Sequence, residues 1–306
     1  MALTTIIAGC DLSQHSDQAL ERAIGIALLH RAKIVLVHAQ ASEATVAGAA
    51  NVANAELAQL GEVSAAIRAE ETARLGDKLA EVQGLGLRAA VISRIGPPDE
   101  VLATAAHDEQ ADLIVVGTQG HSGVARFLLG SVASTTIRRA PCDVLVARGP
   151  AVQAPFARPL VATDFSPAAA KAVGRAANVV APGSRIDVVH AWQLPAGSWG
   201  ATLLGQARFP WSTVRDAVLA SARAQADQFV ADHGPELRVD LIQGPPAQVI
   251  TETAERGGHD LIVVGAHGNR GFRRLLLGSV AESTVRHAHC SVLVVHGPAR
   301  PPSHSG

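Results

Sequence analysis

The sequence predicts an α/β protein built from two similar domains, each with a five-stranded parallel sheet flanked by helices. Residues 112–146 and 260–294 align without a gap and are identical at most positions. In each half, short apolar runs alternate with segments of helical length, and a glycine-rich loop follows the fourth run. A repeat this long is a duplicated domain, because the units of solenoid proteins usually span only about 20–50 residues.

The duplication extends over nearly the whole chain. Ile7–Ser13 matches Leu160–Ser166, and the Val-His-Ala and Gly-Pro-Pro triplets of the first half recur in the second. The segment Ala147–Pro159 is rich in Pro and Ala and indicates a connection between the halves. We therefore expect domains at residues 1–148 and 156–298, a linker at 149–155 and a disordered tail at 299–306.

Five apolar runs of the first half predict its strands. They are Thr4–Ala8, Lys33–Ala39, Arg88–Ile92, Leu113–Val116 and Val144–Ala147. Short continuous runs of this kind are typical of parallel strands that are buried on both faces of a sheet. Because strands alternate with helical segments, we expect a parallel sheet with right-handed crossovers.

The helices are predicted between these strands, at about residues 16–30, 54–83, 98–108 and 131–139. Ser166-Pro167 marks a helix start, because serine is a favoured N-cap and proline suits the first helical position. The Gly-Pro-Pro triplets at 96–98 and 244–246 punctuate the third helix of each half in a similar way. Each half should therefore contain about four helices.

Composition narrows the class of protein. Hydrophobic residues make up 48% of the chain, but no apolar run approaches the roughly 18 residues of a membrane span. The N-terminus has no export signal, so we expect a cytoplasmic protein. A net charge of −1 gives no electrostatic reason to bind nucleic acid or a membrane surface. Cys142 and Cys290 occupy equivalent positions and are expected to be small buried residues rather than disulfide partners.

The histidines do not predict a metal centre. The segment His287–Cys290 contains ligand types, but the first half has Arg139-Ala140-Pro141-Cys142 at these positions, and no second cluster completes a tetrahedral set. His38 and His190 fall in predicted strands, so we interpret them as hydrogen-bonded core residues. The sequence also lacks a GxSxG elbow and any Ser-His-Asp set, and we name no catalytic residue.

The repeated glycine loop indicates a phosphate site. Its pattern is Gly-x2-Gly-x9-Gly-Ser, with Gly117, Gly120, Gly130 and Ser131 in the first half and Gly265, Gly268, Gly278 and Ser279 in the second. Glycines let backbone N–H groups approach a ligand closely, and the final Gly-Ser opens a helix, whose N-terminus attracts anions. The loop is neither a P-loop nor a dinucleotide GxGxxG motif. A glycine-rich turn that only reverses the chain is the alternative.

Two aspartates are expected to face these loops. Asp11 and Asp164 follow the first strand of each half, and ligands of open α/β sheets bind where the strand order reverses. A carboxylate there could accept hydrogen bonds from ribose hydroxyls, and the small residues Ala39 and Ala191 would leave room for a flat base. Alternatively, each aspartate only shapes the approach to the next helix.

With these motifs, both halves resemble the universal stress protein family in its tandem two-domain form. The glycine motif matches the nucleotide-binding members of that family. The resemblance implies Rossmann-like (adenine nucleotide alpha hydrolase-like) domains with strand order 3-2-1-4-5 and ATP at the switch point, with Mg²⁺ on its phosphates. It also implies that the domains pair through their last strands, at Val144–Val146 and Val292–Val294, as an internal pseudo-dimer; a homodimer of two chains stays open.

The predicted ligand residues form two equivalent sets. The first set is Gly9, Cys10, Asp11, Ala39, Val116, Gly117, Gly120, His121, Arg126, Gly130, Ser131 and Val132. The second set is Ala162, Thr163, Asp164, Ala191, Val264, Gly265, Gly268, Asn269, Arg274, Gly278, Ser279 and Val280. Arg126 and Arg274 could pair with phosphates or could be solvated loop charges. Because Cys10 corresponds to Thr163, we expect the two sites to bind differently.

Three classes of function are compatible with these residues. The first is an ATP-binding stress-response or regulatory protein with little or no hydrolysis. The second is an enzyme that uses the nucleotide, such as a slow ATPase or an adenylyl transferase, for which the sequence offers no identifiable acid or base. The third is an interaction scaffold whose pockets hold no nucleotide. The sequence names neither the stress nor a protein partner.

Overall fold

The computed structural model describes residues 2–41, 57–118, 129–194, 211–234, 237–267 and 277–296. The chain divides into two compact units, residues 1–155 with 296–306, and residues 156–295. The predicted tail, 299–306, lies outside the described residues.

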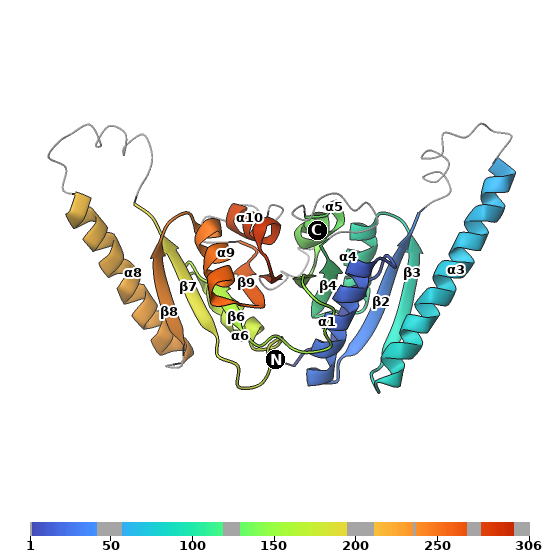
Figure 1. The fold of residues 1–306 in the computed structure, drawn as a ribbon, viewed down its shortest axis with the longest axis horizontal. Coiled ribbons are helices and arrows are strands. Elements are labelled where there is room, and N and C mark those ends of the chain that lie inside the picture. Colours follow the sequence, from blue (N-terminus) through green and yellow to red (C-terminus); the bar gives the residue numbers. More distant parts are fainter. Residues whose placement is uncertain are drawn as a thin grey trace, which may run out of the picture. The chain divides into compact units, whose positions relative to one another are not determined.

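The first unit alternates strands and helices along the chain (Figure 1). Its elements are β1 (Thr5–Gly9), α1 (Gln14–His30), β2 (Lys33–Gln40), α3 (Leu57–Gly84), β3 (Ala89–Ile95), α4 (Pro98–Asp108), β4 (Leu113–Gly117), α5 (Ser131–Arg139) and β5 (Asp143–Ala147). All strand pairs are parallel, and the order in this unit is β3-β2-β1-β4-β5. The predicted five-stranded sheet is confirmed, with its switch point between β1 and β4.

The second unit repeats this arrangement. Its elements are β6 (Pro159–Ala162), α6 (Pro167–Ala176), β7 (Asp187–Trp192), α8 (Trp211–His233), β8 (Arg238–Gln243), α9 (Pro246–Gly257), β9 (Leu261–Gly265), α10 (Ser279–His287) and β10 (Ser291–Val295). Parallel pairing gives the order β8-β7-β6-β9-β10 within this unit. Both halves therefore have the predicted Rossmann-like topology, and the switch point of the second lies between β6 and β9.

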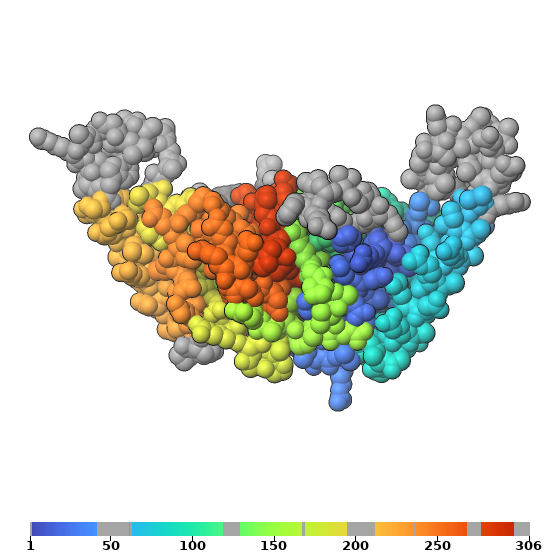
Figure 2. Space-filling model, viewed as in Figure 1, coloured from blue at the N-terminus to red at the C-terminus, as the bar shows by residue number. Residues whose placement is uncertain are grey.

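Helices cover both faces of the first sheet. Helix α1 packs on β1 and β4, α3 packs on β2 and β3, and α4 packs against α5. Since the chain reverses direction across the sheet after β3, right-handed crossovers place α4 and α5 on the face opposite α1 and α3. Helix α3 lies along the margin of its unit (cyan in Figure 2), and most of its described side chains are exposed, while Ser64, Leu75 and Val82 are buried.

The core of each sheet consists of the apolar runs that predicted the strands. Ile6, Ile7, Ile34 and Leu36 are fully buried, as are the branched residues of β4 and β5. Burying an aliphatic side chain of this size stabilises the fold by about 1.5–3 kcal/mol. Continuous burial on both faces explains why these strands do not alternate apolar and polar residues. The edge strand β3 is more exposed.

The predicted helix starts are confirmed by the capping contacts. Ser166 is the N-cap of α6 and its hydroxyl accepts a hydrogen bond from the Ala169 N–H at 3.1 Å, with Pro167 in the first turn. Pro98 and Pro246 open α4 and α9. Among the described helices, none is long and apolar enough to cross a bilayer.

Candidate functional site

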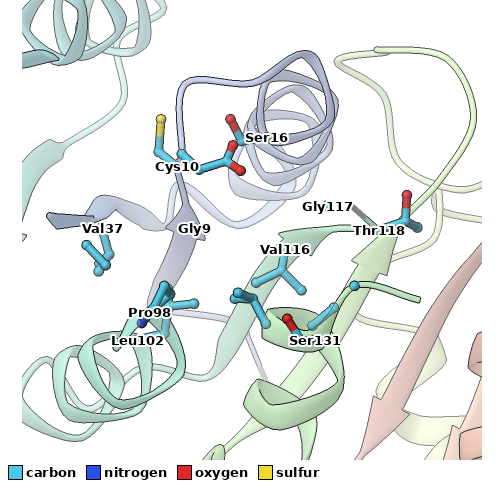
Figure 3. Close-up of a pocket in the computed structure, with 15 residues that line it drawn as sticks. Gly9, Cys10, Ser16, Val37, Pro98, Leu102, Val116, Gly117, Thr118 and Ser131 are labelled. Carbon is cyan, nitrogen blue, oxygen red and sulfur yellow. The ribbon is translucent and has the colours of Figure 1, made fainter. Parts of the chain in front are cut away.

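A cavity of about 370 Å³ lies at the carboxyl ends of β1 and β4 in the first unit (Figure 3). This is the switch point of the sheet, where open α/β domains bind their ligands. Nine predicted ligand residues line it: Gly9, Cys10, Asp11, Ala39, Val116, Gly117, Gly130, Ser131 and Val132. Gly120, His121 and Arg126, also predicted for this site, lie outside the described residues. The structure thus brings together residues from four separate segments of the chain.

Six lining residues were missed by the sequence analysis. They are Ser16, Val37, Pro98, Leu102, Thr118 and Ala133. Pro98 and Leu102 come from the first two turns of α4, and with Val37 they give the cavity an apolar wall (Figure 3). The signal was present in the repeated Gly-Pro-Pro triplet, which marks a helix that starts at the same end of the sheet as the glycine loop. The sequence analysis treated this triplet only as punctuation.

A strained turn positions Asp11 at the edge of the cavity. One carboxylate oxygen, Oδ1, accepts hydrogen bonds from the Ser13 N–H at 3.0 Å and from the Ser13 hydroxyl. Leu12, between them, has φ of 62°, a left-handed conformation that is unfavourable for a branched side chain. The second unit has the same turn, with Phe165 at φ of 58° and Asp164 Oδ1 accepting from the Ser166 N–H at 3.0 Å. The aspartates therefore do shape the approach to the next helix, and Asp11 in addition lines the cavity.

The side chains of Cys10 and Thr163 serve the same turn. The Thr163 hydroxyl accepts a hydrogen bond from the Phe165 N–H at 3.0 Å. Burial raises the pKa of the Cys10 thiol, an effect that is partly opposed by a hydrogen bond from the Leu12 N–H. The thiol packs with Leu12 and Leu75 and points away from Val116 and Ser131 (Figure 3). The difference between Cys10 and Thr163 therefore lies within the turn.

The base of the glycine loop is closed by a backbone hydrogen bond in both units. The Gly130 N–H donates to the Thr118 carbonyl at 2.8 Å, and the Gly278 N–H donates to the Ala266 carbonyl at 2.9 Å. Gly120, His121 and Arg126, and in the second unit Gly268, Asn269 and Arg274, lie between these anchors, outside the described residues. The N–H of the last motif glycine is thus engaged within the protein.

The backbone hydrogen-bond donors available to a ligand in the described part of the loop are N–H groups at the start of helix α5. Its first intrahelical bond runs from the Ser134 N–H to the Gly130 carbonyl at 3.1 Å, and no side chain caps this end. Within the part of the chain that the structure describes, the N–H groups of Ser131, Val132 and Ala133 have no acceptor. All three residues line the cavity. Uncapped helix N-termini of this kind bind anions, because their free N–H groups point at the ligand.

Close backbone approach explains the glycines at the strand ends. A Cβ atom added at Gly117 would lie 2.7 Å from the His15 carbonyl oxygen, where α1 starts. One added at Gly9 would lie 3.2 Å from a methyl group of Val116. Neither glycine, nor Gly130, Gly265 or Gly278, has a positive φ. At Gly117 the packing excludes a Cβ atom, and at Gly9, Gly265 and Gly278 an added Cβ atom would make tight contacts of 3.1–3.3 Å.

The hydrogen bonds expected for the two strand histidines are confirmed, but only His38 is buried, and His190 is half-buried. His38 Nδ1 donates to the Cys10 carbonyl at 2.7 Å, and His190 Nδ1 donates to the Thr163 carbonyl at 2.9 Å. Each histidine thus bonds the carbonyl of the residue that follows the first strand of its unit, where the turn begins. Among the described residues, no group of three or more His, Cys, Asp or Glu side chains is arranged to hold a metal ion. The three cysteines all lie among the described residues and form no disulfide, and Cys142 is half-buried where full burial was expected.

The second unit places its predicted residues in the same pattern. Ala162 ends β6, followed by Thr163 and Asp164, while Val264 and Gly265 end β9 and Ala191 lies in β7. Gly278 caps α10, which begins with Ser279 and Val280 and has no side-chain cap. The ligand roles of these residues, like those of the first set, stay predictions.

The fold and the cavity define the class of protein: it is a tandem Rossmann-like α/β protein, and the cavity lies at the switch point of the first sheet. The model of the universal stress protein family matches residues 3–148 and 156–296. The chain therefore belongs to the universal stress protein family. A universal stress protein of Mycolicibacterium smegmatis is 30% identical over 294 residues, covering 95% of this chain and 96% of that protein.

Two archaeal proteins extend the comparison. A universal stress protein of Methanocaldococcus jannaschii is 40% identical over 79 residues, which cover 26% of this chain and 46% of that protein. The crystal structure of a universal stress protein from Archaeoglobus fulgidus superposes with a TM-score of 0.66 at 23% identity, covering 95% of this chain and 96% of that one. This second likeness shows the shared fold.

Proposed function

We propose that the protein binds ATP, with Mg²⁺ on the phosphates, and acts as a stress-response or regulatory module with little or no hydrolysis. The uncapped start of α5 in the cavity is the observation that carries the proposal. Three free N–H groups in one place suit the oxygens of a phosphate chain, and the Ser131 hydroxyl adds a fourth donor. The cavity volume lies within the usual range for small-molecule sites, about 300–1,000 Å³.

The rest of the cavity suits a nucleoside. Val37, Ala39, Pro98 and Leu102 offer apolar surface for a flat base at the β2 side. Asp11 follows β1, which lies between β2 and β4 in the sheet, and its carboxylate at the cavity edge can accept hydrogen bonds from ribose hydroxyls. Phosphate, ribose and base would thus follow one another across the sheet edge from β4 to β2.

Binding without rapid turnover is favoured by the chemistry of the lining. Among the described lining residues, Asp11 is the single ionisable group apart from the Cys10 thiol, and its Oδ1 accepts two hydrogen bonds within the turn. Hydrolysis needs a base or a water-orienting group near the terminal phosphate. The described part of the lining offers hydroxyls, from Thr118 and Ser131, and no imidazole or amine; residues 119–128 of the loop are not among the described residues.

The proposal is tested by a matched pair of substitutions at one residue. Ser131→Pro removes the N–H and the hydroxyl but leaves the helix intact, because proline is favoured at the first helical position. Gly130 before it, at φ −59° and ψ 148°, already has the conformation that precedes proline. Ser131→Ala removes only the hydroxyl. Calorimetric titration should show ATP affinity in the order wild type, Ser131→Ala, Ser131→Pro, with at least a tenfold loss for the last if one charge-assisted hydrogen bond is worth about 1.5–3 kcal/mol.

Two results would point to the other classes of function. Phosphate release at many turnovers per minute, abolished by Ser131→Pro, would indicate an enzyme. An absence of binding by ATP, ADP and AMP to the wild-type protein would leave an interaction scaffold. Ser279→Ala and Ser279→Pro serve as the corresponding pair for the second unit.

A further inference from the structure

Helix α3 holds the turn that presents Asp11. The turn consists of Cys10–Ser13 and contains Leu12 in its left-handed conformation. A branched residue keeps such a backbone only where its surroundings impose it. The contacts that impose it come from a helix that begins more than forty residues further along the chain.

The contacts lie on one side of α3. The Arg74 guanidinium donates from Nη2 to the Leu12 carbonyl at 3.1 Å. Leu75, 2% exposed, packs against Cys10 and Leu12. Lys78 pairs with Asp17 in the first turn of α1 at 2.5 Å. Arg74 and Leu75 lie four and three positions before Lys78, and residues three or four positions apart are neighbours on a helix surface, so α3 presents these groups together.

The second unit holds the equivalent turn by different means. The Phe165 ring lies 4.4 Å from the His190 ring and 5.8 Å from that of Phe229 in α8. Phe229 in turn stacks on His233 at 4.3 Å. The same strained turn is therefore held by ring packing in one unit and by a guanidinium–carbonyl contact in the other.

We infer that Arg74 is a positioning residue for the nucleoside part of the ligand in the first unit; this inference rests on the proposed function. Arg74 does not line the cavity. It acts through Leu12, whose carbonyl it anchors, and so through the neighbouring Asp11. Losing this anchor frees the turn, and the carboxylate then spends less time in the orientation that accepts hydrogen bonds from ribose. The phosphate donors of α5 are on a different element and are unaffected.

The test compares adenosine with ATP. Arg74→Met removes the charge and keeps the length and apolar stem of the side chain, while Arg74→Lys keeps a donor. Arg94→Met is the control, because Arg94 pairs with Asp108 at 3.1 Å on the exposed side of the unit. We expect Arg74→Met to lower the affinity for adenosine and for ATP by the same factor, about fivefold or more. Arg74→Lys should recover most of the loss, and Arg94→Met should bind like wild type. Ser131→Pro, by contrast, should weaken ATP alone.

A second measurement separates positioning from stability. Amide hydrogen exchange of Leu12 and Ser13 should accelerate in Arg74→Met, while exchange in the β4 and β5 core stays at the wild-type rate. Unchanged affinities in a folded Arg74→Met protein overturn the positioning role and leave the proposed function intact. A loss confined to ATP also overturns it. A wild-type protein that binds neither adenosine nor ATP overturns the proposed function itself.

Discussion

At the scale of single residues, the candidate site requires glycines, which have no Cβ atom, at the ends of two strands. Gly117 and Gly9 end neighbouring strands and allow α1, β4 and α4 to meet around one cavity. At Gly117 the obstacle to a side chain is the backbone of His15, which cannot rotate away as a side chain could. Packing, rather than an unusual dihedral angle, thus keeps this position free of a Cβ atom.

Gly117→Ala should therefore destabilise the protein, in contrast to a glycine with open space. The new Cβ at 2.7 Å from the His15 oxygen forces a backbone shift, which typically costs about 1–3 kcal/mol. Gly174 lies inside α6 and an added Cβ there meets nothing within 4 Å, so Gly174→Ala should stabilise by about 0.5–1 kcal/mol. Urea unfolding of both variants measures these free energies. Shifts of the same sign would contradict the packing explanation.

The Cys10 thiol should give the stability of the protein an alkaline dependence. Burial raises the pKa of this thiol in the folded state, so the unfolded chain ionises first. The contribution is fully present below about pH 8.5, the usual thiol pKa, and is lost as the pH rises toward the folded value. Cys10→Thr copies Thr163 and removes the titrating group. Between pH 7 and pH 9.5, the free energy of unfolding should fall further in wild type than in Cys10→Thr; parallel curves would exclude the effect.

At the scale of elements, two helices of equivalent position start with unequal caps. The Ser13 hydroxyl accepts from the Ser16 N–H at 3.3 Å and also donates to Asp11, whereas the Ser166 hydroxyl accepts from the Ala169 N–H at 3.1 Å. Among the described contacts, a side-chain hydrogen bond of the N-cap serine ties the first helix start to the aspartate, and a backbone N–H of Ser166 bonds Asp164 in the second.

Ser13→Ala should consequently affect both stability and binding. Loss of an N-cap costs about 1 kcal/mol, which is the effect expected for Ser166→Ala. Ser13→Ala should cost more and should weaken adenosine binding in the first unit, because Asp11 loses one of the hydrogen bonds that hold its carboxylate. Thermal unfolding together with calorimetric titration checks the pair. Equal costs in the two variants would show that the Asp11 contact adds nothing.

The elements were predictable because they depend on local sequence. Apolar runs, Ser166-Pro167 and the Gly-Pro-Pro triplets predicted strands and helix starts that the structure confirms. The left-handed turns were not predictable, because Leu12 and Phe165 are not residues that favour positive φ. The hydrogen bond from Arg74 to the Leu12 carbonyl joins residues far apart in the chain, so no local sequence pattern predicts it. The contribution of Leu102 to the apolar wall was not predictable, because it depends on how α4 packs on β1 and β2.

At the scale of the whole molecule, one chain carries two copies of the same strand–turn–helix arrangement, with a predicted set of ligand residues in each. The Cys10 and Thr163 side chains both satisfy the N–H two residues on, so this difference does not by itself separate the affinities. The remaining difference lies in the loops, where the second half has Arg270, Arg273 and Arg274 against Ser122, Ala125 and Arg126 in the first. These positions are outside the described residues.

We predict that the C-terminal site binds ATP more tightly and that the difference shrinks as ionic strength rises. Added positive charge near the phosphates strengthens binding, and salt screens that charge over about 8–10 Å. Ser131→Pro and Ser279→Pro each leave one site open, so titrations of the two variants at low and high salt give separate affinities. A tighter N-terminal site, or equal sites at low salt, would refute the ranking. Exposed arginines that contribute little are the competing explanation.

Ala154 packs against helix α1, and this contact affects whether the two halves could exchange places in the chain. A Cβ atom at Gly25 would lie 2.5 Å from the Ala154 nitrogen, and the Arg22 guanidinium donates to the Ala154 carbonyl at 3.2 Å. Glycine at position 25 of α1 therefore allows the segment that follows β5 to pack closely on this helix. If the order of the halves were reversed, the segment that contains Ala154 would no longer follow the first copy. The surface of α1 at Gly25 would then lose this packing partner. The packing at Gly25 therefore depends on the order of the two copies in the chain.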